Sequence, residues 1–208
     1  MEPIRIVAVS AGLGRPSSTR LLADRLADAV ERHLADGERP VEARVIELRD
    51  LATGIAHTMV TGFPGPALRE ATGAVAEADG LIAVTPIFNA SYSGLFKSFF
   101  DVLDNTALRG KPVAVAATGG TPRHSLALEH ALRPMFAHLR AVVVPTAVYA
   151  ATEDWGAGDA RHDELSGRIE RAAEELADLV RARPASAGRP DGEPVTPFRE
   201  QLASLGLR

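Results

Sequence analysis

The 208-residue sequence contains no cysteine, which excludes disulfides, thiolate nucleophiles and thiolate metal ligands. Aromatic residues are few, at 5% of the chain, with a single tryptophan. The six histidines are scattered, and none forms a closely spaced ligand pair on a helix face, so we expect no metal site. Thiol and metal chemistry are therefore not expected in this chain.

Long hydrophobic runs are also missing, and no stretch reaches the length needed to span a bilayer. Residues 1–3 pass directly into an aliphatic run at 4–9 without a basic segment before it, so we expect no signal peptide and a cytoplasmic location. The formal net charge of −4 gives no strong electrostatic reason to bind nucleic acid or a membrane surface. A phosphate would have to be bound by a local group of residues.

The hydrophobic pattern alternates short aliphatic runs with helical stretches. The runs predict strands at residues 4–9, 41–48, 80–85, 112–118 and 142–149. Helices are expected after Ser17 and Ser18 and at residues 65–78, 93–104, 124–139 and 162–182, with a kink at Pro134. This alternation predicts an α/β fold: a flavodoxin-like, doubly wound, five-stranded parallel sheet of order 2-1-3-4-5 with helices on both faces.

The length fits one main domain, for which we take residues 1–183. Residues 184–208 are rich in Pro, Gly and Ala at first and are expected to form a mobile or partner-docking extension. In doubly wound sheets, ligands bind beyond the carboxyl ends of the strands, where the strand order reverses. That rule selects three loops, at residues 10–19, 85–94 and 118–124.

The first loop leaves a strand through two glycines and enters a helix through Ser17, Ser18 and Thr19. Free N–H groups at a helix start, with these hydroxyls and Arg15, suit a terminal phosphate. The simpler alternative is that a serine merely caps the helix. No Gly-Lys-Ser/Thr sequence follows, so this is not a Walker loop, and Ser17 stands where a dinucleotide fingerprint has its third glycine.

The second loop places small polar residues between two apolar elements. Pro86 is expected to end the strand, and Gly94 allows close approach at the start of the next helix. Between them, Phe88, Asn89 and Ser91 suit the face and edge of a flat polar heterocycle. The alternative is that the loop only caps the helix and that Phe88 packs in the core.

The third loop, T118-G-G-T-P-R-H124, follows the fourth predicted strand. Gly119 and Gly120 leave backbone N–H groups free to face the pyrimidine oxygens of a flavin, whose reduced form carries negative charge there. Arg123 and His124 are placed to meet a second anion, such as a phosphate of a nicotinamide dinucleotide. The alternative is a tight turn whose glycines need positive φ.

Together the three loops resemble the NADPH-dependent FMN reductase family, and within it the branch that supplies reduced FMN to two-component flavin monooxygenases. The resemblance covers about residues 4–150 and is most specific in A-D-G-L-I-A-V-T-P-I-F-N-A-S-Y-S-G-L-F-K, followed by A-T-G-G-T. Phe88 stands where tyrosine is common in the family. His130 occupies a position where some relatives carry an aromatic residue at a helix irregularity.

The resemblance implies an NAD(P)H:FMN oxidoreductase that transfers a hydride from C4 of NADPH or NADH to N5 of FMN, without a catalytic acid or base. It also implies a homodimer or homotetramer. Phosphate contacts would come from Ser10, Ser17, Ser18 and Thr19, isoalloxazine contacts from Pro86, Ile87, Phe88 and Asn89, and pyrimidine contacts from Thr118, Gly119, Gly120 and Thr121.

Two other functions are compatible with the same fold. One is an enzyme that keeps FMN bound and reduces quinones, azo dyes or metal oxyanions. The other is a flavodoxin-type electron carrier, although carriers usually cover the flavin with aromatic loops and this chain has few aromatics.

Overall fold

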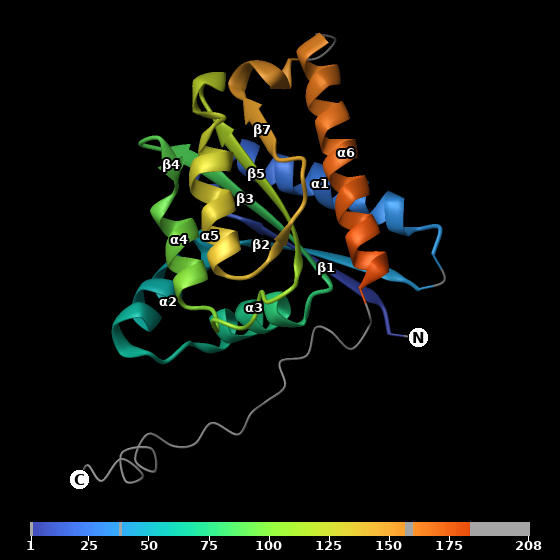
Figure 1. Ribbon diagram of the computed structural model, residues 1–208. Helices are drawn as coiled ribbons and strands as arrows, with labels where there is room; N and C mark the ends of the chain where they lie inside the picture. The colour runs from blue at the N-terminus through green and yellow to red at the C-terminus, as the bar shows by residue number, and fades with distance from the viewer. Residues whose placement is uncertain (1, 38, 157–159, 184–208) are drawn as a thin grey trace, which may run out of the picture.

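The computed structural model describes residues 2–37, 39–156 and 160–183, which form a seven-stranded sheet between two layers of helices (Figure 1). The strand order is β2-β1-β3-β5-β6, with β4 paired to β3 and β7 paired to β5. All pairings are parallel except β3 with β4. The strands are β1 (Ile4–Ser10), β2 (Val41–Glu47), β3 (Gly80–Phe88), β4 (Ser91–Tyr92), β5 (Pro112–Gly119), β6 (Val142–Val143) and β7 (Val148–Ala151). The expected extension at 184–208 lies outside the described residues.

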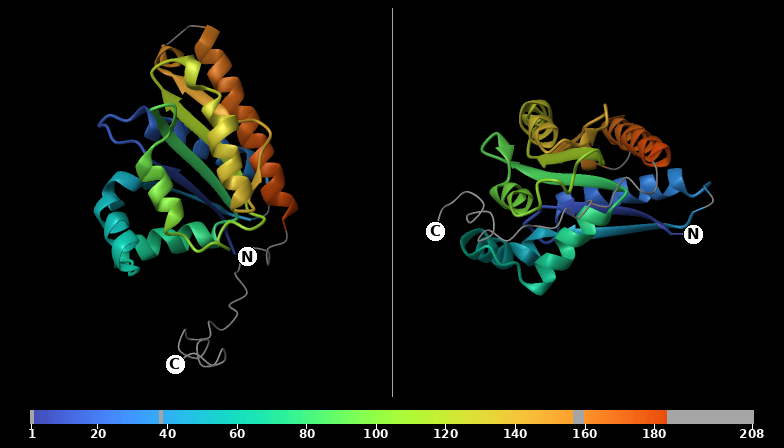
Figure 2. Two further views of the ribbon diagram at one scale, coloured as in Figure 1. Left: turned by 60° about the vertical axis from the view of Figure 1, so that its left-hand side comes forward. Right: turned by 60° about the horizontal axis from the view of Figure 1, so that its bottom comes forward.

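Helices cover both faces of the sheet, as the sequence predicted (Figure 2). In β1, Ile6 and Ala8 pack under α1 and α6, while Val7 and Val9 face the layer that holds α2 to α5, because successive strand residues point to opposite faces. The helices are α1 (Ser18–Leu34), α2 (Leu48–Thr61), α3 (Pro66–Glu77), α4 (Gly94–Asp101), α5 (Arg133–His138) and α6 (Ala160–Ala182). Short turns are η1 (Pro122–His124), the π-helix η2 (Leu128–Leu132) and η3 (Thr152–Trp155).

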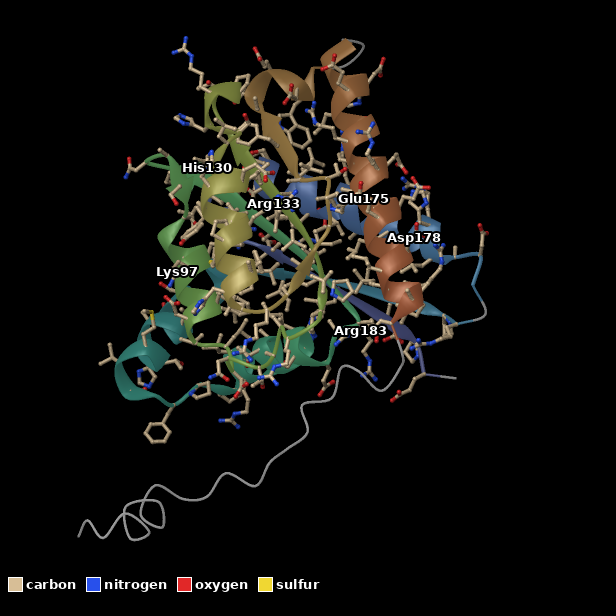
Figure 3. The ribbon with its side chains drawn as sticks, viewed as in Figure 1. Lys97, His130, Arg133, Glu175, Asp178 and Arg183 are labelled. Atoms are coloured by element: carbon tan, nitrogen blue, oxygen red, sulfur yellow. The ribbon has the colours of Figure 1, made fainter. Side chains whose placement is uncertain are left out.

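The prediction of five strands in the order 2-1-3-4-5 was wrong in two respects: the last predicted strand is divided into two, and β4 was not predicted. Residues 142–149 do not form one strand: Pro145, which lacks a backbone N–H, separates β6 from β7, and both pair with β5. Side chains of α5 and α6 hold the connection between β6 and β7; Figure 3 labels the two residues, Arg133 and Glu175. Arg133 Nη1 donates to the Val144 carbonyl over 2.8 Å, and Glu175 accepts from both N and Oγ1 of Thr146 over 2.7 Å.

Helix α2 was not predicted from the sequence. It starts directly after β2 with no side-chain hydrogen bond at its N-cap, Glu47, and it buries only Leu48, Ile55 and Thr58. Without a capping serine or a wide apolar stripe, its sequence lacks the usual helix signals. The expected irregularity near Pro134 is present, since the π-helix η2 precedes α5.

A second correction concerns Pro86, which was expected to end its strand. Strand β3 continues through Pro86, which is in register with Thr118 of β5. The pairing of β1 with β3 extends only to Val84, so beyond it β3 is no longer a central strand on that side. An edge position of this kind tolerates a missing backbone donor.

Lys111 joins α3 to the start of β5 from inside the protein. The residue is 1% exposed, and its ammonium donates to the carbonyls of Val75, Ala76 and Ala78 over 2.7, 2.8 and 2.7 Å. These carbonyls belong to the C-terminal turn of α3, where a positive charge is favoured by the helix dipole. Burial lowers the pKa of Lys111 to about 7.

No helix within the described residues is long and apolar enough to cross a membrane.

Candidate functional site

The three predicted loops meet at the carboxyl edge of the sheet, because β1, β3 and β5 are adjacent parallel strands. The register aligns Ser10 with Val84 and Pro86 with Thr118. The first and third loops are joined directly: the hydroxyls of Thr19 and Thr118 share a buried hydrogen bond of 2.8 Å. The structure thus brings together residues that are about a hundred positions apart in sequence.

The first loop folds back onto the start of α1. Ser17 is the N-cap, and its hydroxyl accepts from the backbone N–H of Arg20 over 3.1 Å, so the capping alternative is confirmed for this residue. A Cβ atom on Gly12 would lie 2.0 Å from Ser17 Oγ, so a side chain there would displace the serine from its cap position. Ser18 stays exposed, whereas Ser10 is buried and its Oγ has no hydrogen-bond partner among the described residues. A buried hydroxyl without a partner, in the loop that leads into α1, suits a polar ligand.

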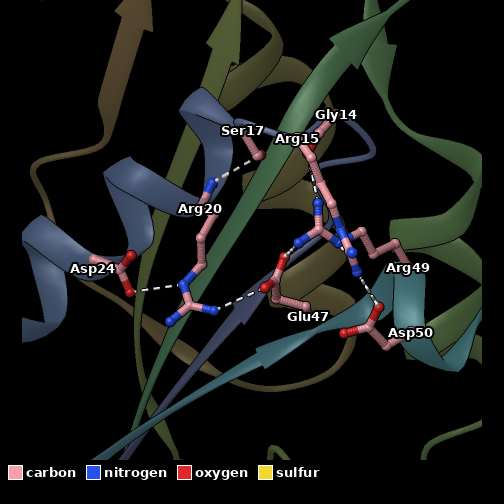
Figure 4. Close-up of polar contacts among 8 residues, drawn as sticks. All are labelled: Gly14, Arg15, Ser17, Arg20, Asp24, Glu47, Arg49 and Asp50. Carbon is pink, nitrogen blue, oxygen red and sulfur yellow. Dashed lines mark hydrogen bonds and ion pairs between the residues drawn. The ribbon is translucent and has the colours of Figure 1, made fainter.

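Charged residues surround this loop (Figure 4). Glu47, at the carboxyl end of β2, accepts from Arg20 Nη1 over 2.9 Å, and Arg20 Nε donates to Asp24 over 2.8 Å. The hydrogen bond to Asp24 is the main reason that the pKa of Arg20 is raised. At the tip, Arg15 Nη2 lies 3.4 Å from Asp50 Oδ1 in an exposed pair.

The second loop is a tight hairpin between β3 and β4. Asn89 and Ala90 form its turn with φ of 49° and 66°, the left-handed values that two-residue hairpins use. Phe88 is 46% exposed at the sheet edge, so the alternative that it packs in the core was wrong. The other part of that alternative is confirmed, since the buried Ser93 caps α4 by accepting from Phe96 N over 3.2 Å.

The third loop is held by a residue that sequence reasoning missed. Tyr149 of β7 donates its hydroxyl to the Thr121 carbonyl over 2.8 Å. Its Oη would be 2.1 Å from a Cβ atom on Gly119, so a side chain is excluded there by contact. Neither Gly119 nor Gly120 has positive φ, and the alternative of a positive-φ turn is therefore wrong. A single tyrosine within the aliphatic run A-V-Y-A-A was the available signal.

Tyr149 is itself largely buried, and burial, followed by the nearby charge of Asp154, raises its pKa. Its hydroxyl therefore stays protonated as a donor at neutral pH. Arg123 and His124, by contrast, lie exposed in η1, at the end of this loop. No cluster of three or more potential metal ligands occurs within the part of the chain that the structure describes.

The arrangement offers hydroxyls, backbone N–H groups and an arginine on the β1 side, and on the β5 side a glycine loop bonded to Tyr149. The exposed ring of Phe88 lies on the hairpin between them. These groups have the chemistry to bind a ligand that has an anionic end and a polar aromatic end.

The sequence pattern of the family described as NADPH-dependent FMN reductase matches residues 4–156. A protein of Pseudomonas aeruginosa named FMN reductase (NADPH) is 38% identical over 182 residues, covering 88% of this chain and 95% of the relative. This chain belongs to the NADPH-dependent FMN reductase family.

A second relative with the same identity carries a different nucleotide in its name. It is the NADH-dependent FMN reductase SfnF of Pseudomonas fluorescens, also 38% identical, covering 86% of this chain and 92% of the relative. Overall similarity to these two FMN reductases therefore does not favour either nicotinamide cofactor.

Solved structures agree with this membership. An oxidoreductase from Corynebacterium diphtheriae superposes with a TM-score of 0.85 and 44% identity, covering 88% of this chain and all of that one. A WrbA-like flavodoxin from Agrobacterium tumefaciens, at 16% identity and a TM-score of 0.58, covers 89% of this chain and 99% of that one. This second likeness shows that the fold is flavodoxin-like.

Proposed function

We propose that this member of the family is an NAD(P)H:FMN oxidoreductase that binds FMN across the carboxyl edge of the sheet. The meeting of the three loops at that edge, with the unpaired buried hydroxyl of Ser10, is the observation that carries the assignment. Bound FMN supplies the redox chemistry by accepting a hydride at N5 from C4 of the nicotinamide. The protein's part is to bind the two molecules and orient them.

The first loop holds the phosphate in this proposal. A dianionic phosphate satisfies the Ser10 hydroxyl and meets the N-terminus of α1, where N–H groups and the helix dipole favour negative charge. Arg15, 75% exposed on its side chain, is free to turn from Asp50 toward the anion. The residues assigned to the phosphate are Ser10, Arg15, Ser17, Ser18 and Thr19.

The second and third loops border the ring system. Phe88 offers an exposed aromatic face, and the glycine loop held by Tyr149 presents backbone groups to the pyrimidine edge, where reduced flavin carries negative charge. Thr19 and Thr118 also bond to each other, so besides their assigned contacts they join the start of α1 to the end of β5. Ring contacts are assigned to Pro86, Ile87, Phe88, Asn89, Ser91, Thr118, Gly119, Gly120 and Thr121.

We further propose that reduced FMN leaves the site and serves a flavin-dependent monooxygenase, and that the chain assembles as a homodimer or homotetramer. The family resemblance supports both statements. The open position of the hairpin tip, where residues 88–90 are exposed, is compatible with exchange of the flavin.

Steady-state kinetics test the function directly. NADPH or NADH oxidation is measured with FMN, riboflavin and FAD, together with gel filtration of protein mixed with FMN. We expect FMN-dependent turnover and flavin that separates from the protein on the column. No rate above background with any flavin would refute the reductase, whereas tightly retained flavin with fast quinone reduction would identify a bound-flavin enzyme.

A further inference from the structure

Arg49 lies outside all three loops, in the first turn of α2, yet it contacts the backbone of the first loop. Its Nη1 donates to the Gly14 carbonyl over 2.6 Å (Figure 4). We propose that Arg49, held by Glu47, is a positioning residue that fixes the shape of the phosphate loop and so makes the site prefer FMN to riboflavin. This inference rests on the proposed assignment of the loop to the FMN phosphate.

The loop needs such an anchor because packing does little to hold its tip. Leu13 is 54% exposed, and residues 14–16 are exposed as well. A segment that buries little apolar surface gains little from the hydrophobic effect and depends on specific polar contacts for a fixed shape. The bond from Arg49 to Gly14 is a charge-assisted contact of this kind.

Glu47 holds the anchor in place. Its Oε2 lies 2.5 Å from Arg49 Nη2, while its Oε1 accepts from Arg20 Nη1 in the first turns of α1. The side chains of Arg49 and Glu47 are only 17% and 16% exposed, so solvent screens this pair less than a surface pair. The Glu47 carboxylate thus connects Arg49, which contacts the tip of the first loop, with Arg20 of α1. In the proposed function, the N-terminus of α1 is the helix end that meets the phosphate.

The contacts divide the work between two arginines. Arg49 donates from Nη1 to Gly14 and keeps Nη2 beside Glu47 Oε2, and we therefore assign it to the shape of the loop. Its buried Nε has no hydrogen-bond partner among the described residues and lies 3.8 Å from Asp50. Arg15 is far more exposed, and its contact with Asp50 is a long 3.4 Å. A phosphate competes easily with that exposed pair, because exposed ion pairs contribute little stability.

The test compares Arg49→Met and Arg49→Lys with the wild type, using FMN and riboflavin as substrates. We expect Arg49→Met to raise KM for FMN about tenfold while kcat and the KM for riboflavin change less than about twofold. Arg49→Lys should behave like Arg49→Met, because a compact ammonium lacks the planar fork that reaches both acceptors. The matched control is Arg44→Met in β2, which removes an exposed arginine–carboxylate pair with Glu70 of α3.

The outcomes distinguish failure of the phosphate assignment from failure of the role proposed for Arg49. An inactive wild type, or a Ser17→Val variant with unchanged KM for FMN, overturns the phosphate assignment and this inference with it. If the wild type is active and Ser17→Val raises KM for FMN, three results overturn the role of Arg49 alone. These are an unchanged KM in Arg49→Met, an equal rise for both flavins, and full recovery in Arg49→Lys, which would make positive charge sufficient.

Discussion

Replacing Gly119 with alanine tests whether Tyr149 sets the shape of the third loop. The new Cβ atom would lie 2.1 Å from Tyr149 Oη and 3.1 Å from Tyr149 Cζ. Ordinary contact needs roughly 3.5 Å, so the hydroxyl is the atom that excludes alanine. Gly119 has no positive φ, and its backbone therefore accepts alanine without strain. We expect the clash to push the tyrosine away from the Thr121 carbonyl.

Phenylalanine at position 149 removes the oxygen that clashes. Overpacking by Gly119→Ala should lower the free energy of unfolding by about 2 kcal/mol, and the hydrogen bond lost in Tyr149→Phe by about 1 kcal/mol. Independent effects would add to about 3 kcal/mol in the double variant. In the double variant the atom nearest to the new Cβ is Cζ, so the clash is smaller. We therefore expect the free energy of unfolding to fall by only about 1.5 kcal/mol, which is about 1.5 kcal/mol less than the sum of the two single losses.

Urea unfolding of the wild type, both single variants and the double variant measures this coupling. Steady-state KM values for FMN and riboflavin give a second readout, and we expect both to rise in Gly119→Ala because both flavins share the pyrimidine edge. The reasoning is refuted if the two stability losses add to within about 0.5 kcal/mol. It is refuted equally if KM changes for FMN but not for riboflavin.

Three further predictions concern Lys111 and Gly12. Lys111→Met leaves the three carbonyls of α3 without their ammonium donor, and we expect a loss of about 3 kcal/mol in urea unfolding. Burial lowers the pKa of Lys111 from its ordinary value of 10.5 to about 7, so between these pH values the unfolded chain binds a proton that the folded chain does not. The stability of the wild type should therefore rise relative to that of Lys111→Met between pH 7 and pH 10. A stability difference that stays constant over this range would contradict the prediction. Gly12→Ala places a Cβ atom 2.0 Å from Ser17 Oγ, so the serine must leave its cap position; KM for FMN should rise with KM for riboflavin unchanged, and unaltered FMN kinetics would argue against the phosphate loop.

Local sequence signals predicted the elements that frame the site. The aliphatic run before Ser10 predicted β1, and the hydroxyl residues at 17–19 predicted the start of α1. Both signals come from residues close together in the sequence. The last strand was harder, because Pro145 interrupts a run that otherwise reads as continuous. Helix α2 was missed since its stability comes from packing beside α3 and α4 rather than from caps or a broad apolar stripe.

The residues that support the site were harder to predict than the loops themselves. Arg49 contacts Gly14 from 35 positions away, and Tyr149 reaches Thr121 from 28 positions away. No periodicity or motif connects such pairs, because the contact exists only once α2 and β7 take their places beside the loops. Sequence patterns therefore located the candidate ligand-binding loops, while the side chains that hold them emerged only from the three-dimensional arrangement.

The buried hydrogen bond between Thr19 and Thr118 limits which loops can be exchanged between related enzymes. A donor loop that lacks one threonine would leave the other hydroxyl buried with no partner, which is more harmful than removing both. Loop grafting in this scaffold is consequently a paired operation. We therefore expect that the start of α1 and the end of β5 have to be exchanged together.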